Sequence, residues 1–363
     1  MRAVHVVLPD GIDDPARPSG GNIFDRRVCH ALASLGWSVH EHPVPGFWGR
    51  PDAASFAALA DVMSAIPDGA VVLLDGLIAS TAPDVLVPQA PRLRLVVLVH
   101  MPLGHWPAGG DGDQDDAPAV VRTREGAALG AAAAVITTSA WTRRRLGELY
   151  ALPADRMFVA EPAVDPADAA GLAAGTVDGG ALLCVAAVTH QKGHDVLLDA
   201  LTTIADLTWE CECVGRLDRD PAFVRALRRR LTDAGLQDRV HLAGPRTGPA
   251  LDRTYAAADL MVLASRAETY GMVIAEALAH GVPVMAADVG GVTEALGHGA
   301  DGIRPGVLVA PGDPAPLAAA LRQWLTDAEL RGRLRRAARE RRASLPTWPA
   351  TAAVIADVLA GAL

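Results

Sequence analysis

Two glutamates, Glu268 and Glu276, stand eight residues apart, and a glycine, Gly271, lies between them. The apolar run 260–264 predicts a strand before them, and the pattern over 272–280 predicts a helix that starts at Gly271. Free backbone amides at a helix start can bind an anion such as a diphosphate. Glu276 falls in the second turn of this helix, where its carboxylate can accept hydrogen bonds from sugar hydroxyls. Taken alone, the spacing also fits two solvated or capping glutamates.

A second candidate site surrounds Lys192, the only lysine in the chain, which precedes Gly193. These residues follow a strand predicted over 182–188 and precede a helix predicted over 195–204. An ammonium group at the carboxyl end of a strand, beside a helix start, suits a phosphate. An exposed lysine without a ligand is the alternative interpretation.

A glycine pair follows the first predicted strand, 4–8, in the run SGGN over 19–22. Paired glycines let a ligand approach the backbone closely, and Asn22 can cap the helix predicted over 23–35. A plain loop with a capping residue is the alternative. His100 directly follows another predicted strand, where it serves either an active site or the core.

Composition limits the class of protein. Of the 363 residues, 50% are hydrophobic, which is enough for a sizeable core, and the formal net charge is −9. The acidic balance and the aromatic content of 4% argue against a nucleic-acid-binding protein, which needs a basic face and stacking side chains. The sequence has neither a run of 18 apolar residues nor a signal-peptide pattern. We therefore expect a cytoplasmic protein without a transmembrane segment.

The sequence predicts no metal or redox site. The four cysteines are Cys29, Cys184, Cys211 and Cys213. They form no C-x-x-C pair, and we interpret them as small buried hydrophobic residues. The acidic segment 109–118 lacks the glycine and the final glutamate of a calcium loop and predicts a surface loop. The arginine-rich run 331–342 predicts a helix with a solvated face, and contact with acidic lipid is the alternative. P-loop, zincin and α/β-hydrolase motifs are absent from the sequence.

Short apolar runs alternate with amphipathic stretches through most of the chain. Continuous apolar strands between helices predict parallel sheets that are covered on both faces. This alternation of apolar runs and amphipathic stretches begins again near residue 170. The segment 161–180, which is rich in Pro, Ala, Asp and Gly, predicts a linker between the two halves. We therefore expect two doubly wound α/β domains, 1–165 and 166–345, with a ligand cleft between them.

The block from Glu268 to Pro283 resembles the signature of the retaining glycosyltransferases of family 4, which have the GT-B fold. Further stretches that resemble this family follow in order along the chain: the SGGN run, the strand that ends in His100, the segment around Ser139, Ala163-Val-Asp165, the run that starts at Gln191, and the helix 348–359. The resemblance covers nearly the whole chain. It implies two Rossmann-like domains that face a central cleft and a C-terminal helix, 346–363, that packs back on the first domain.

The resemblance implies transfer of a glycosyl group from a nucleoside diphosphate sugar to an acceptor hydroxyl, with retention and without a metal or cofactor. The second domain would bind the donor, and the first would bind the acceptor, which is a small molecule, a glycan or a lipid-linked group. The expected catalytic residues are Glu268, His100 and Lys192. The expected donor-binding residues are Gly20, Gly21, Lys192, Tyr270, Gly271, Met272, Val273 and Glu276.

These residues have different expected roles within that scheme. Lys192, the amides of the glycine pair and the helix start would stabilise the leaving diphosphate. Glu268 and His100 would contact the donor sugar, and Glu276 would bind the ribose.

Two positions depart from the family pattern, and the milder change is Ala163, where the family has its hinge glycine. The family usually has an arginine five residues before the motif lysine, where this chain has Ala187. His190 or Arg246 could take its place. Two other functions stay open. One is a GT-B-fold isomerase or hydrolase of nucleotide sugars, and the other is a non-catalytic nucleotide-sugar binder, which the departure at Ala187 makes plausible. A metal-dependent GT-A transferase would need the run 218–220 as its D-x-D motif, which fits a two-domain chain poorly.

Overall fold

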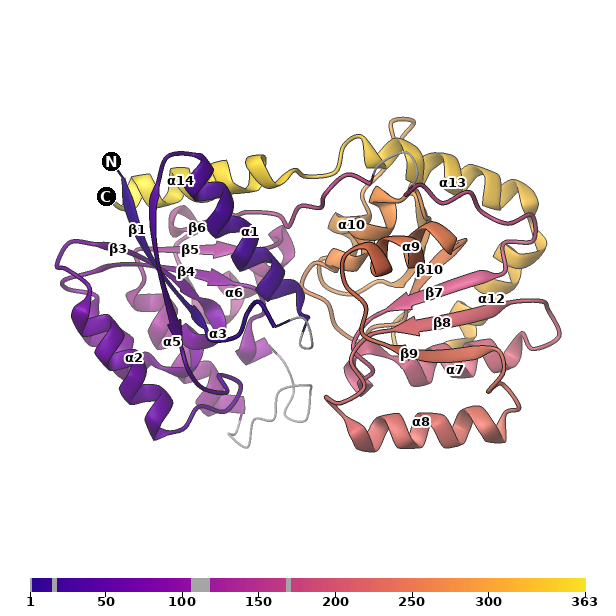
Figure 1. Ribbon diagram of the computed structural model, residues 1–363, viewed down its shortest axis with the longest axis horizontal. Coiled ribbons are helices and arrows are strands. Elements are labelled where there is room, and N and C mark those ends of the chain that lie inside the picture. The colour runs from indigo at the N-terminus through magenta and orange to yellow at the C-terminus, as the bar shows by residue number, and fades with distance from the viewer. Residues whose placement is uncertain (1, 15–17, 106–117, 168–170) are drawn as a thin grey trace. The chain divides into compact units, whose positions relative to one another are not determined.

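The computed structural model describes residues 2–14, 18–105, 118–167 and 171–363. The chain divides into two compact units (Figure 1). The first unit comprises Met1–Pro162 and Pro346–Leu363, and the second comprises Ala163–Leu345. Apart from Pro118, the predicted surface loop 109–118 lies outside the described residues.

The first unit contains a six-stranded parallel sheet in the order β2-β1-β3-β4-β5-β6. Its strands are β1 (Ala3–Pro9), β2 (Ser38–Val44), β3 (Val71–Asp75), β4 (Arg94–Val99), β5 (Ala134–Thr137) and β6 (Met157–Val159). Its α-helices are α1 (Gly20–Ser34), α2 (Ala53–Ala65), α3 (Gly76–Thr81), α4 (Pro83–Leu86), α5 (Pro118–Ala131), α6 (Ala140–Tyr150) and α14 (Trp348–Ala362). The C-terminal helix α14 packs against α1 and against β3, β4 and β5.

The second unit contains another six-stranded parallel sheet, in the order β12-β11-β10-β7-β8-β9. Its strands are β7 (Ala181–Val185), β8 (Glu210–Val214), β9 (Val240–Gly244), β10 (Leu260–Leu263), β11 (Val284–Ala287) and β12 (Gly306–Val309). Its α-helices are α7 (His194–Thr203), α8 (Pro221–Asp233), α9 (Pro249–Ala257), α10 (Met272–Ala279), α11 (Val292–Leu296), α12 (Pro314–Thr326) and α13 (Ala328–Arg342).

Strand alternation explains why the second sheet is covered on both faces. Leu182 and Cys184 of β7 belong to one core cluster, which includes side chains of α7, α8 and α12. Leu183 and Val185 belong to another, which includes side chains of α9, α10 and α11. Successive residues of a strand point to opposite faces, so a continuous apolar run fills both layers. The predicted class, two doubly wound α/β domains, is confirmed.

Each sheet reverses its strand order at one place, between β1 and β3 in the first unit and between β7 and β10 in the second. Open parallel sheets bind ligands beyond the carboxyl ends of their strands at such a point. Lys192 follows β7 and Glu268 follows β10, so they flank the reversal in the second unit. Asp75 ends β3 and the glycine pair follows β1, so they flank the reversal in the first.

Several local predictions differ from the structure. The glycine pair forms the first turn of α1 rather than a loop, and Ser19 caps that helix by accepting from the Asn22 amide at 3.1 Å. The predicted cap at Asn22 is therefore wrong. Strand β2 has no counterpart among the predicted elements because it is a partly exposed edge strand with polar residues and Pro43, so it lacks an apolar run.

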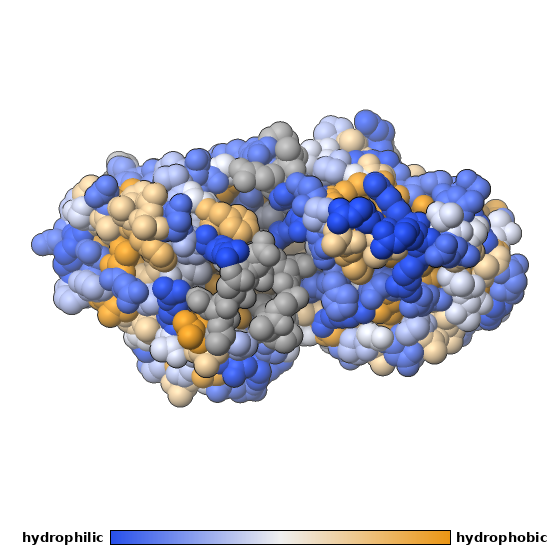
Figure 2. All heavy atoms as spheres, turned by 90° about the horizontal axis from the view of Figure 1, so that it is seen from below, coloured by the Kyte–Doolittle hydropathy of each residue, from blue (hydrophilic) through white to orange (hydrophobic). Residues whose placement is uncertain are grey.

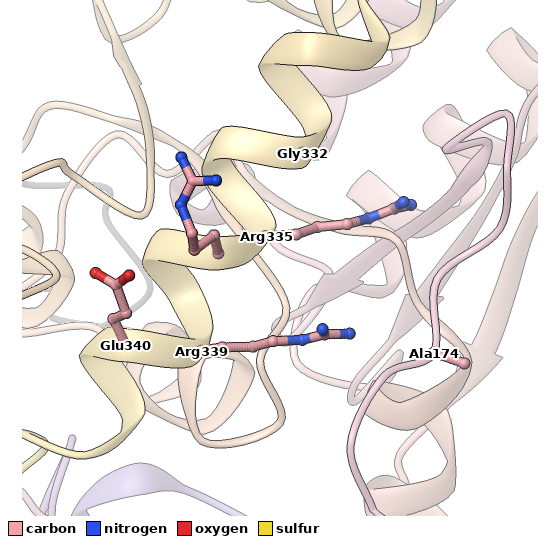
Figure 3. A pocket seen from close by; sticks show the side chains of 6 residues that line it. Ala174, Gly332, Arg335, Arg339 and Glu340 are labelled. Carbon is pink, nitrogen blue, oxygen red and sulfur yellow. The ribbon is translucent and has the colours of Figure 1, made fainter.

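The arginine-rich helix α13 uses several guanidinium groups inside the second unit. Arg331 is only 8% exposed and donates to backbone carbonyl groups, and Arg335 pairs with the buried Asp259 at 2.7 Å. Figure 3 shows Arg335 and Arg339 extending toward the segment that carries Ala174. The predicted solvated face is therefore only part of this helix. A hollow of about 610 Å³ beside it is lined by Ala174, Gly332, Arg335, Arg336, Arg339 and Glu340.

The amphipathic helix α8 shows how the surface of the second unit is made. Its apolar side chains Val224 and Leu227 are buried, whereas Arg225, Arg228 and Arg229 are exposed. Figure 2 looks onto the side of this unit on which α8 lies and shows strongly hydrophilic side chains there. Among the described helices, none is both long enough and apolar enough to cross a bilayer.

Candidate functional site

The second unit brings Lys192 and Glu268 together. Lys192 Nζ lies 2.7 Å from Glu268 Oε1, and the buried Ser265 hydroxyl donates to the same oxygen at 2.8 Å. The Glu268 side chain is 10% exposed and the Lys192 side chain is 26% exposed. A half-buried ion pair at the carboxyl edge of the sheet, close to the strand reversal, is suited to bind a charged ligand.

Three glycines allow backbone segments to approach closely enough for this ion pair to form. Gly193 has φ +68°, and a side chain there would collide with the Ala264 carbonyl group. Gly290 has φ +56° and lies against the Glu268 carbonyl group, while Gly291 lies against the Thr269 carbonyl group. The Gly291 amide also donates to the Glu268 carbonyl oxygen at 3.3 Å. The glycines therefore bring the Lys192 and Glu268 loops and the loop after β11 into direct backbone contact.

We expect Gly290→Ala to destabilise the fold more than an ordinary glycine substitution. The added Cβ would collide with the Glu268 carbonyl oxygen, in a backbone conformation that already disfavours side chains. Gly302→Ala is the matched control, since Gly302 has φ +78° and no atom within 4 Å of a built Cβ. Chemical denaturation should show that Gly290→Ala lowers the free energy of unfolding by about 1–3 kcal/mol more than Gly302→Ala does. If both variants lose the same free energy of unfolding, the close contact between Gly290 and the Glu268 carbonyl group is not important for stability.

The predicted diphosphate-binding turn starts at Gly271, which has φ +91° and precedes α10. Tyr270 is 1% exposed, and Met272 and Val273, which are partly buried, form the first turn of the helix. The Ile274 amide donates to the Gly271 carbonyl oxygen at 2.8 Å, so the amides of Met272 and Val273 are the ones offered to an anion at this helix start.

Glu276 has a partner that the sequence analysis did not identify. The hydroxyl group of Tyr255, in α9, donates to Glu276 Oε2 at 2.7 Å, and the Tyr255 ring stacks on His280 with centroids 5.0 Å apart. Burial raises the pKa of Glu276, although the Tyr255 hydroxyl partly opposes this by favouring the carboxylate. Among the described residues, Tyr255 is the one hydrogen-bond donor to this carboxylate. Tyr255 thus orients a carboxylate that retains accepting capacity.

In the first unit, His100 lies among buried carboxylates. Its Nε2 atom is 2.8 Å from Asp25 Oδ1, on α1, and 3.8 Å from Asp75 Oδ2, at the end of β3. Phe24 packs edge-on against the imidazole with centroids 5.2 Å apart, and a Cβ added at Gly21 would contact the ring. Asp75 Oδ1 also accepts from the Leu77 amide at the start of α3. The fold therefore holds His100 in one orientation.

The charges of this cluster are coupled. Burial, together with the Asp25 charge, raises the pKa of Asp75 to about 7. Burial opposes protonation of His100, but the attraction of Asp25 and Asp75 outweighs it and raises the His100 pKa. Buried titratable groups at the carboxyl edge of a sheet are typical of a functional site.

We expect Asp75→Asn to make stability less sensitive to rising pH. The folded protein keeps the Asp75 proton up to about pH 7, whereas the unfolded chain loses it near 3.8. Because the folded state then binds more protons, wild-type stability falls as pH rises through this window, and the raised His100 pKa extends the fall above 6.5. Asparagine retains the helix cap without the charge.

Thermal unfolding between pH 5 and pH 8 measures this effect. The midpoint should fall less for Asp75→Asn than for wild type, while Asp61→Asn, at an exposed position on α2, should follow wild type. If the unfolding midpoint changes with pH in the same way for all three proteins, Asp75 is not the cause of the pH dependence.

Two of the missed residues had a signal in the sequence. Asp25 occupies the buried face of α1 together with Cys29 and Leu32, so helical periodicity could have identified it. Asp75 is the only charged residue of β3 and ends a wholly buried strand. The Tyr255 contact depends on packing between α9 and α10, which no local pattern shows.

Both predicted substitutes for the missing arginine have partners within the second unit. Arg246 Nη1 lies 2.9 Å from Glu212 Oε2, and the same group donates to Thr254. The His190 ring packs edge-on against Phe223. In the run 218–220, Asp218 pairs with Arg216 and Asp220 caps α8, so these carboxylates already have structural partners.

Comparison with known proteins shows which proteins the chain resembles. Residues 179–327 match the family model described as glycosyl transferases group 1. The chain is 32% identical over 240 residues to a D-inositol 3-phosphate glycosyltransferase of Jonesia denitrificans, which covers 61% of this chain and 55% of the relative. It is 30% identical over 190 residues to the mannosylfructose-phosphate synthase of Agrobacterium fabrum. This match covers 51% of this chain and 41% of that relative. The chain thus spans little more than half the length of the curated relatives it matches.

Solved structures match over nearly the whole chain. Sucrose-phosphate synthase from Thermosynechococcus elongatus superposes with a TM-score of 0.79 at 21% identity and covers 99% of both chains. HepE of Anabaena, solved in complex with UDP-glucose, gives a TM-score of 0.74 at 18% identity and covers 99% of this chain and 100% of that one. These similarities establish the fold. The chain therefore has the fold of these glycosyltransferase structures, and residues 179–327 of its second unit are similar to the group 1 glycosyl transferases.

Proposed function

We propose that the protein is a retaining glycosyltransferase that uses a nucleoside diphosphate sugar and needs no metal for the transfer. The observation that carries the proposal is the Lys192–Glu268 pair at the strand reversal of the second unit. It lies within the part of the chain that matches the group 1 glycosyl transferases. The first unit would bind the acceptor hydroxyl.

The donor would be held by groups of complementary chemistry. The Lys192 ammonium and the free amides at the start of α10 would stabilise the charge that develops on the leaving diphosphate. Glu268, which has Lys192 and Ser265 as partners, would contact the sugar next to the bond that breaks. Glu276, oriented by Tyr255, would accept hydrogen bonds from the ribose.

Arg216 is the residue best placed to supply a second cation for the diphosphate. Val185 of β7 pairs with Val214 of β8, and the Val188 amide donates to the Arg216 carbonyl oxygen at 2.8 Å. Continuing this register for two more residues along both strands places Ala187 opposite Arg216. The missing positive charge would therefore come from the neighbouring strand end. Arg216 pairs with Asp218 at 2.9 Å, and Asp218 is 68% exposed. An ion pair with an exposed partner contributes little to stability.

Arg216→Ala should weaken binding of a nucleoside diphosphate about tenfold or more, because a charge-assisted contact is lost. The corresponding nucleoside, which lacks phosphates, should bind both proteins equally. Ala187→Arg in the Arg216→Ala background should restore affinity by returning a guanidinium to the paired strand. Calorimetric titration measures these differences.

Arg219→Ala is the control, since Arg219 is exposed and three residues further along the chain. If Arg216→Ala binds like wild type, or if Arg219→Ala weakens binding equally, the second cation is not Arg216.

The proposed activity separates from its two alternatives by product analysis. The protein is incubated with each nucleotide sugar that binds, with EDTA, and with or without a panel of sugars and polyols as acceptors. Nucleotide release that depends on the acceptor, with an unchanged anomeric configuration, supports the transferase. Conversion without an acceptor would instead show an isomerase or hydrolase, and saturable binding without conversion would show a binder. Activity that returns only with magnesium or manganese would contradict the metal-free reaction.

A further inference from the structure

A cluster of soft metal-ligating side chains lies in the core of the second unit, apart from the candidate donor site. Cys184 of β7, Cys213 of β8 and His194, the first residue of α7, are 1%, 2% and 2% exposed. One ligand atom from each lies within 4.8 Å of the other two. Cys184 Sγ is 3.7 Å from His194 Nε2.

The topology explains why these residues meet. Cys184 and Cys213 are register partners in neighbouring parallel strands, so their side chains leave the sheet on the same face. That face is covered by α7, whose buried residues join the same core cluster, and Figure 1 shows α7 alongside β7 and β8. Cys211 stands two residues before Cys213 on β8 and therefore points to this face as well. Three thiols and one imidazole thus share one layer.

The spacing fits tetrahedral coordination. Zinc binds thiolate sulfur at about 2.3 Å and imidazole nitrogen at about 2.0–2.1 Å, which places two such ligands about 3.6 Å apart. The observed distance between sulfur and nitrogen is 3.7 Å. Thiolates and imidazole select zinc over magnesium or calcium, which prefer oxygen ligands.

The His194 ring is otherwise poorly compensated for its burial. Its Nδ1 atom is buried and has no hydrogen-bond partner among the described residues, and a thiol is a weak partner for Nε2. Buried polar groups normally have strong partners, and leaving them without one costs free energy. A metal ion bound at Nε2 would replace the weak thiol contact with a strong bond, and Nδ1 would then carry the ring proton.

We propose that Cys184, His194 and Cys213 form a structural zinc site. The Cys211 thiol lies outside this group of close ligand atoms, so it becomes the fourth ligand only if it moves toward the ion. Each coordinating thiol releases its proton to solvent when the ion binds, and no electron is transferred. Because the site is buried, the ion enters as the protein folds. It joins the ends of β7 and β8 to the start of α7, directly after Lys192 and Gly193. The site does not rest on the proposed glycosyl transfer.

The test is cobalt substitution during expression, followed by absorption spectroscopy of the purified protein. Cobalt in a site with thiolates shows an intense sulfur-to-metal charge-transfer band in the near ultraviolet. This band distinguishes the cluster from His5, His40 and His42 of the first unit, which stack on one another and offer only imidazole. Mass spectrometry of zinc-grown protein gives the metal content, and we expect one ion per chain with the thiolate band in the cobalt protein.

Variants assign the ligands. Cys184→Ser and Cys213→Ser should lower the charge-transfer band at least tenfold, and Cys29→Ser, at a buried cysteine of the first unit, should retain it. Retention of the band in Cys211→Ser would give a three-residue site, and its loss a four-residue site; both support the proposal. If the substituted proteins fail to fold, the wild-type spectrum still decides. A wild-type protein without the thiolate band, or a band that persists in Cys213→Ser, would overturn the proposal.

Discussion

Glu268→Gln is expected to lower kcat at saturating donor about 10- to 100-fold while binding of the nucleoside diphosphate changes little. The substitution keeps the shape of the side chain and its contact with Ser265 but removes a negative charge that has Lys192 at 2.7 Å. If this charge stabilises the positive charge that develops on the sugar, its loss raises the barrier by about 1.5–3 kcal/mol. An interaction made only in the transition state affects kcat rather than ground-state binding.

The control is Glu294→Gln, on α11, which changes a glutamate of the same unit outside the Lys192–Glu268 pair. Turnover follows from product formation with the donor identified by binding, and calorimetry gives the affinity for the nucleotide. If Glu268→Gln abolishes nucleotide binding and leaves kcat intact at high donor concentration, Glu268 contacts the nucleotide part of the donor rather than the sugar.

Lys192→Ala should weaken binding of the nucleoside diphosphate about 10- to 100-fold, since it removes a charge-assisted contact with the phosphate groups. It also leaves the buried Glu268 carboxylate with Ser265 as its remaining partner, so we expect lower thermal stability. Lys192→Arg should restore little affinity, because the guanidinium is larger and spreads its charge.

A double variant separates these two effects of Lys192→Ala. Lys192→Ala with Glu268→Gln removes the unpaired buried charge, so stability should recover while nucleotide affinity stays low. If affinity recovers together with stability, the ammonium acts only through Glu268, and the phosphate contact is wrong.

The donor-side half of the site could be predicted because its signals are local in sequence. Glu268, Gly271 and Glu276 belong to one strand-loop-helix segment, and Lys192 belongs to another. Parallel strands bring their carboxyl ends to one edge, so the position of each residue after its strand already predicts where it lies. The sequence could not show that Lys192 and Glu268 pair, because this depends on the backbone contacts at Gly193 and Gly290.

Other features depend on contacts between distant segments. Asp25, Asp75 and His100 come from α1, β3 and β4, and only the assembled sheet brings them together. Likewise, the cysteines of β7 and β8 carry no metal-binding spacing, because their proximity arises from strand register rather than from a sequence motif. The predicted cap at Asn22 failed because the helix begins at Gly20, three residues before the predicted start.

Calorimetric titration with nucleoside diphosphates of the common bases, their sugars and the matching monophosphates tests whether the second unit binds a nucleotide sugar. We predict that at least one diphosphate and its sugar bind saturably, more tightly than the monophosphate, and that Lys192→Ala and Arg216→Ala each weaken this binding. If no nucleoside diphosphate or nucleotide sugar of the panel binds to the folded wild-type protein, the account of the second unit as a nucleotide-sugar site is wrong.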